Sequence, residues 1–197
     1  MASDVTDARH AREEPAPEAG PPPAEPRRSW LKLPSELSAS LLAITTVPIG
    51  NAPPHFPPWA VFISWAGTFA SGGPKREVIR KLVPVQVLGS VTAMLIVLCF
   101  NWASHHWTGT SFTIAQMIIL AVLNSSMILV GRLVPALSFV PGMFFGFASY
   151  FATYFGGFGL HPQNAWTSLW AVVAMNALGV VYAWIQPRLT RPADQHH

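Results

Sequence analysis

Three adjacent polar side chains interrupt an apolar stretch at "LNSSM", residues 123–127. Asn124, Ser125 and Ser126 would occupy most of one helical turn, so at least one of them must face away from any single neighbouring helix. In the middle of a membrane this arrangement favours a polar cavity or a contact with a second helix. Asn and Ser side chains form hydrogen bonds without carrying charge, so they suit a small neutral solute better than an ion.

Other neutral hydrogen-bonding side chains lie in the apolar stretches, Gln86, Ser90, Thr92 and Asn176 among them. From all the neutral polar residues of the apolar stretches, we assign seven to a candidate solute path: Ser64, Thr68, Asn124, Ser125, Ser126, Ser149 and Thr153. The alternative is that these groups only join helices by hydrogen bonds, which contribute about 0.6 kcal/mol each on average in membranes.

Ionisable side chains are absent from the predicted hydrocarbon core. Between residues 37 and 186, the charged residues are Lys75, Arg76, Glu77, Arg80, Lys81 and Arg132. Proton-coupled transporters usually bury a titratable group, so this pattern argues against a proton-driven pump, although backbone carbonyls can bind Na⁺. We expect no enzyme, because we find no nucleophile–base arrangement, phosphate-binding loop or H-E-x-x-H motif.

The histidines and the single cysteine predict no metal site and no cofactor. Imidazoles are common metal ligands, but no carboxylate or thiol accompanies the loop histidines. These are His55, His105, His106 and His161. Cys99 lies within an apolar run and has no second cysteine to pair with, so we expect it to be a packing residue.

Long apolar stretches organise the chain, and stretches of about 18 or more residues are typical of transmembrane helices. We predict an all-α polytopic membrane protein in which residues 34–187 form a transmembrane domain. Its six spans are 35–50, 58–72, 79–102, 111–131, 134–156 and 165–186. The second span, about 22 Å long, either just crosses the bilayer or is a re-entrant or broken helix.

Both ends of the chain differ in composition from this domain. Residues 1–33 contain "EEPAPEAGPPPAEPRR", which is rich in Pro, Ala and Glu and predicts a disordered N-terminal tail. Residues 188–197 form a short C-terminal tail.

The distribution of basic residues predicts that both termini are cytoplasmic. The loops "NAPPHFPP", "SHHWTG" and "GGFGLHPQN" contain no Lys or Arg. With six spans, all the basic residues near the spans fall on the other side, as the positive-inside rule requires. They are Arg27, Arg28, Lys32, Lys75, Arg76, Arg80, Lys81, Arg132, Arg188 and Arg191. The net charge of +3 therefore indicates the lipid bilayer, and not a nucleic acid, as the partner.

Two segments resemble each other, "WAGTFASGG" at 65–73 and "FASYFATYFGG" at 147–157. Each lies in the second span of a set of three, and two such sets would have opposite orientations in the membrane. The pattern predicts a 3+3 inverted repeat, an architecture that builds many transporters. The alternative is that short strings of Phe, Ala and Gly match by chance.

The segment "LSFVPGMFFG" presents small residues at helical spacing, Ser138, Gly142 and Gly146. Such a face lets helix backbones approach closely in lipid. We expect a tight helix contact here, either inside the protomer or between copies in a homo-oligomer, with Pro141 bending the helix.

"LSFVPGMFFG" and "SWAGTFASGG" also carry a family resemblance. Together they resemble the recurrent segments of the YcdZ-type inner-membrane proteins, domain of unknown function family 1097, over roughly residues 36–186. The resemblance implies a compact multi-span fold in the bacterial inner membrane and supplies no catalytic residues.

Two functions are compatible with this pattern. The neutral polar interior and the predicted repeat favour a channel or facilitator for a small neutral solute. The alternative is a non-transporting scaffold that binds a partner or self-associates, as the small-residue face would allow.

Overall fold

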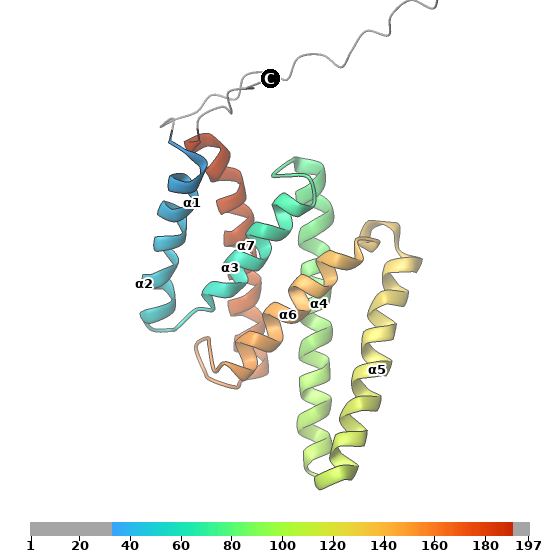
Figure 1. The fold of residues 1–197 in the computed structure, drawn as a ribbon. Helices are drawn as coiled ribbons and strands as arrows, with labels where there is room; N and C mark the ends of the chain where they lie inside the picture. Colours follow the sequence, from blue (N-terminus) through green and yellow to red (C-terminus); the bar gives the residue numbers. More distant parts are fainter. Residues whose placement is uncertain (1–32, 191–197) are drawn as a thin grey trace, which may run out of the picture.

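The computed structural model describes residues 33–190, and within them the secondary structure is helical apart from one isolated bridge between Leu33 and Thr190. Figure 1 shows the arrangement. The helices are α1 (Ser35–Ile44), α2 (Thr46–Asn51), α3 (Pro58–Ala70), α4 (Arg76–Ser104), α5 (Gly109–Leu133), the 3₁₀ helix η1 (Pro135–Leu137), α6 (Val140–Phe155) and α7 (Ala165–Leu189). The predicted N-terminal tail lies outside the described residues, as does most of the C-terminal one.

The helices alternate in direction along the chain. In the view of Figure 1, α1 and α2 run downward, α3 upward, α4 downward, α5 upward, α6 downward and α7 upward. The two ends of the described chain meet, because Leu33 N donates to Leu189 O at 2.9 Å. Ser38 and Thr190 share a second hydrogen bond of 2.8 Å between their hydroxyl oxygens.

Three helices are long and apolar enough to cross a membrane, namely α4 with 29 residues and α5 and α7 with 25 residues each. The chain is therefore a helical membrane protein. α3 has 13 residues and α6 has 16, or about 20 Å and 24 Å at the rise of an α-helix. Both cross the middle of the molecule obliquely between the longer helices (Figure 1).

Proline shapes two of the predicted spans. The first is divided into α1 and α2 at Thr45, where the ring of Pro48 conflicts with the carbonyl of Ile44 one turn earlier. In the fifth predicted span, 134–156, the α-helix α6 begins only at Val140. Pro135 forces Val134 out of the helical region, with φ −112° and ψ 104°, and so ends α5 and starts η1.

α3 and α6 end in the same way. Gly73 N donates to Thr68 O at 3.0 Å, and Phe158 N donates to Thr153 O at 3.1 Å. Each is the long hydrogen bond of a Schellman motif, which needs a residue of positive φ just past the helix. Gly72 and Gly157 supply it, with φ of +106° and +71°.

The core is formed by two closely packed pairs of helices, α4 with α6 and α3 with α7. A Cβ atom on Gly89 of α4 would lie 2.8 Å from the carbonyl carbon of Met143 and 3.0 Å from the backbone nitrogen of Phe147. A Cβ atom on Gly146 of α6 would lie 2.6 Å from the carbonyl carbon of Gln86. The backbones of α4 and α6 therefore touch directly, which only glycine permits.

We predict that Gly89→Ala and Gly146→Ala each lower the free energy of unfolding by about 1–3 kcal/mol, because a methyl group would force two backbones apart. Ala148→Leu is the matched control, since Ala148 is exposed on α6. Thermal unfolding of the purified variants in detergent measures the difference. Glycine variants as stable as Ala148→Leu would contradict a rigid backbone contact.

Candidate functional site

Neutral polar side chains meet where α3, α4 and α6 pack together. Ser64 Oγ of α3 donates to Gln86 Oε1 of α4 at 3.2 Å. Ser90 Oγ, one turn further along α4, lies 2.9 Å from Gln86 O and 3.0 Å from Gly146 O of α6. Ser64, Gln86 and Ser90 are all buried, so these hydrogen bonds form in the interior of the helix bundle.

α7 approaches the same place from the other side. A Cβ atom on Gly179 would lie 2.8 Å from Ser64 Cβ and 2.9 Å from Trp65 N of α3. Asn176 lies one helical turn before Gly179 and is 4% exposed. Residues three apart share a helix face, so Asn176 and Gly179 both face the bundle interior. We call Ser64, Gln86, Ser90, Gly146 and Asn176 the central polar cluster.

Several buried polar atoms have no hydrogen-bond partner among residues 33–190. Two of them, Gln86 Nε2 and Asn176 Oδ1, belong to the central polar cluster. The others are Trp59 Nε1, Asn124 Oδ1, Ser149 Oγ and Ser168 Oγ. An unpartnered buried polar atom costs about 1–3 kcal/mol. Such atoms are rare in folded proteins and call for an explanation.

α4 and α7 have matching patterns of burial. The order of buried, half-buried and exposed residues from Leu82 to Ser90 is the same as that from Val172 to Val180. In this register Gln86 corresponds to Asn176. The two amides therefore occupy corresponding places on two helices that are distant in sequence.

α3 and α6 match in the same way. The burial pattern from Ala60 to Thr68 equals that from Gly142 to Tyr150, except that Trp65 is buried and Phe147 is half-buried. This register pairs Trp65 with Phe147, which are the first residues of the two similar sequence segments, 65–73 and 147–157.

The same register relates the close contacts of the core. Gly179 of α7 faces the backbone at Val61 and Trp65 of α3. Gly89 of α4 faces the backbone of α6 at Met143 and Phe147, which correspond to Val61 and Trp65. The two pairs of helices are therefore packed alike.

Four of the predicted path residues lie in the core, on α3 and α6. Ser64, Thr68, Ser149 and Thr153 are each 0% exposed. Thr68 Oγ1 donates to Ser64 O at 2.8 Å, and Thr153 Oγ1 donates to Ser149 O at 2.7 Å. Among these four, only Ser64 has a hydroxyl bonded to a side chain of another helix.

The polar residues of "LNSSM" lie apart from this cluster, on α5. Ser125 and Ser126 are exposed, and Ser126 Oγ donates to Val122 O of its own helix. Asn124 is half-buried. α5 packs mainly against α4, so these three side chains are not brought together with Ser64.

The predicted packing residues divide into two groups. Gly142 and Gly146 face α4, where a Cβ atom on Gly142 would lie 3.1 Å from Leu82 Cδ1. The contact is thus made within the protomer. Ser138 and Pro141 are exposed, and Ser138 precedes the first residue of α6, so helical periodicity does not place it on the glycine face.

Gln86, Ser90 and Asn176 were absent from the predicted path although they have the same neutral chemistry. The available signal was their spacing from small residues, since Gln86 lies three residues before Gly89 and Asn176 three before Gly179. A polar group one turn from a helix-contact glycine faces that contact.

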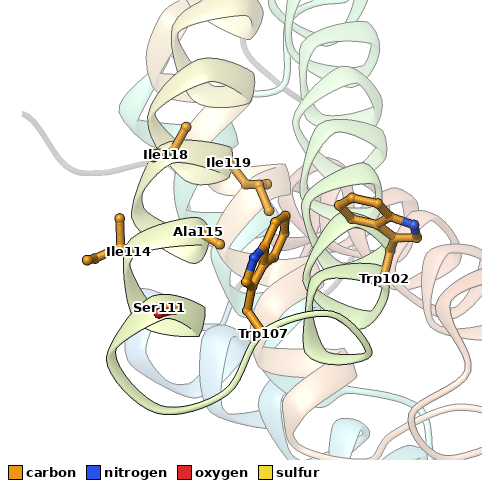
Figure 2. Close-up of a pocket in the computed structure, with 7 residues that line it drawn as sticks. All are labelled: Trp102, Trp107, Ser111, Ile114, Ala115, Ile118 and Ile119. Atoms are coloured by element: carbon orange, nitrogen blue, oxygen red, sulfur yellow. The ribbon is translucent and has the colours of Figure 1, made fainter.

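A separate open pocket lies between the last turns of α4 and the first turns of α5 (Figure 2). It has a volume of about 440 Å³ and is lined by Trp102, Trp107, Ser111, Ile114, Ala115, Ile118 and Ile119. Both Trp rings are partly exposed, as interfacial aromatic residues of membrane proteins are. Within residues 33–190, no group of three or more metal-binding side chains comes together.

A comparison with known families connects this architecture to other proteins. A sequence model described as "Protein of unknown function (DUF1097)" matches residues 36–191. The chain belongs to the DUF1097 family. No curated protein and no solved structure matches this DUF1097 protein. The match covers all of the helices described above except Ser35, the first residue of α1, and it includes the central polar cluster.

We predict that Asn176→Leu raises the free energy of unfolding of the DUF1097 protein by about 1 kcal/mol, because it removes a buried acceptor without a partner. Ser90→Ala should lower it by a similar amount, since it removes a hydroxyl bonded to two carbonyls. Thermal unfolding in detergent compares the two. Equal destabilisation by both substitutions would show that Asn176 Oδ1 has a partner.

Proposed function

We propose that the chain crosses the bacterial inner membrane six times, as a 3+3 inverted repeat. One half comprises α1 to α4, and the other comprises α5 to α7. Matching burial in α3 and α6 and in α4 and α7 supports this arrangement, as do the matching glycine contacts. The alternating helix directions and the meeting of Leu33 with Leu189 support an even number of crossings.

The N- and C-termini face the cytoplasm in this proposal. The basic residues lie at the start of α4 and at the ends of α5 and α7, which are at the same end of the molecule in Figure 1. The loop histidines lie near the opposite helix ends, before α3, after α4 and before α7. The positive-inside rule assigns the basic end to the cytoplasm.

The function that this arrangement supports best is facilitated passage of a small neutral solute. The observation that carries it is the central polar cluster, in which two buried amides have unpartnered atoms at the packing centre of the proposed repeat. Inverted-repeat transporters bind substrate near the midplane, at the interface of their halves. The amides and hydroxyls are uncharged, so an ion would find no opposite charge there.

The proposed topology makes a labelling prediction. In a Cys99→Ser background, His106→Cys and His161→Cys should react with a membrane-impermeant maleimide on intact spheroplasts, because both positions face outward. Lys75→Cys should react only after lysis. Labelling of Lys75→Cys in intact spheroplasts would reverse the orientation, and labelling of His106→Cys without His161→Cys would contradict six crossings.

Transport is tested by stopped-flow swelling of liposomes that contain the purified protein. We expect permeability above that of empty liposomes for at least one of water, urea, acetamide and glycerol. Ser64→Ala should reduce it, because Ser64 lies in the central polar cluster. Thr113→Val is the control, since Thr113 is exposed on α5. If no solute permeates faster, the non-transporting scaffold becomes the better proposal, and co-purification of a stoichiometric partner or a homo-oligomer would test it.

A further inference from the structure

We propose that Gln86 and Asn176 form an occluded binding site for one small neutral molecule that both donates and accepts hydrogen bonds, of which a primary amide is the matching probe. The inference rests on the proposed function and names the class of solute that the central polar cluster would hold.

Ser64 contacts both helices that carry the amides, α4 with Gln86 and α7 with Asn176. Its hydroxyl donates to Gln86 Oε1 at 3.2 Å. Its Cβ atom lies 2.8 Å from the position that a Cβ of Gly179 would occupy, and Asn176 lies one turn from Gly179 on the same face of α7. Asn176 is therefore on the face of α7 that packs against α3 at Ser64, the residue whose hydroxyl binds Gln86.

The cluster is asymmetric in one respect. The matching burial patterns pair Gln86 with Asn176 and Ser64 with Gly146. Gln86 receives a hydrogen bond from the Ser64 hydroxyl, whereas Gly146 has no side chain with which to donate to Asn176. The backbone of Gln86 occupies the place where a side chain of residue 146 would start. The second half of the cluster thus has an acceptor, Asn176 Oδ1, to which no group among the described residues donates.

The unpartnered atoms define the chemistry of a ligand. Gln86 Nε2 is a free donor and Asn176 Oδ1 is a free acceptor, so a ligand must accept from one and donate to the other. A carboxamide or a urea does both with groups held in one plane. A simple ether or ketone can only accept. Because the charged residues within 33–190 lie at or near helix ends, nothing at the cluster would neutralise an ion.

The site is closed in this structure. Gln86 is 2% exposed and Asn176 is 4% exposed, so a ligand reaches them only when the helices around Ser64 separate. The glycine contacts hold α4 to α6 and α7 to α3, so such a separation would have to occur between these two pairs of helices. The proposal therefore describes a carrier with an occluded site and not an open pore.

Binding is measured by saturation-transfer NMR on the methyl protons of acetamide, with the full chain in detergent. Acetone, of similar size but without a donor, is the matched probe. We expect a larger signal for acetamide than for acetone. Gln86→Leu and Asn176→Leu should each weaken acetamide binding about fivefold, the loss that follows from one missing hydrogen bond.

Ser168→Ala is the control variant, because Ser168 also has an unpartnered buried hydroxyl but lies two turns away on α7. It should bind acetamide like the unaltered protein. If Gln86→Leu does not fold, Asn176→Leu carries the test. Equal signals for acetamide and acetone, or unchanged binding in both Leu variants, would overturn the proposal and leave a cluster that holds water alone.

The liposome assay separates this proposal from the transport function. Acetamide binding without any solute flux would support the site and reject the facilitator. Solute flux that is the same in Gln86→Leu, Asn176→Leu and the unaltered protein would support a facilitator and reject this site.

Discussion

The direct backbone contact between α4 and α6 is the interaction on which the rest of the structure depends. In lipid, apolar side chains gain nothing by turning away from their surroundings, so helices associate through close packing and hydrogen bonds. Gly89 and Gly146 remove the Cβ atoms that would separate the two helices. Ser90 Oγ bonds to Gln86 O of its own helix, and only at this short interhelical distance can it also reach Gly146 O of α6. The close contact therefore allows a hydrogen bond between the two helices in addition to their packing.

The short helices follow from the same constraint. α3 and α6 cross the bundle obliquely (Figure 1), and each ends in a Schellman motif whose glycine turns the chain back. Pro58 and Pro141 in the first turns of these helices supply no backbone donor where none is needed. Proline at the start and glycine at the end thus limit α3 and α6 to the part of the bundle in which they pack against α7 and α4.

Sequence reasoning located the long helices α4, α5 and α7 but could not assign helix faces. Apolar length fixed α4, α5 and α7 to within a few residues, because the bilayer thickness sets that signal. The spacing of Gly142 and Gly146 indicated the small-residue face of α6. Ser138 was included because the predicted span began at residue 134, whereas the turn at Pro135 delays the helix to Val140. Which polar residues lie in the core was harder to predict. "LNSSM" is the densest polar string, but it lies on α5, which touches little besides α4.

The polar residues of the central polar cluster lie instead on buried helix faces, away from any polar string in the sequence. Gln86 and Asn176 each stand one turn from a glycine that touches another helix, and this neighbour, more than the residue type, determines their burial. Under the proposed repeat, the two halves share their packing and differ in their polar groups, because Ser64 is matched by Gly146. Packing must be preserved in both halves, since each glycine contact holds a pair of helices together. A single hydroxyl can change without loss of the fold, so the difference between the halves is where a repeated scaffold can acquire one binding site instead of two.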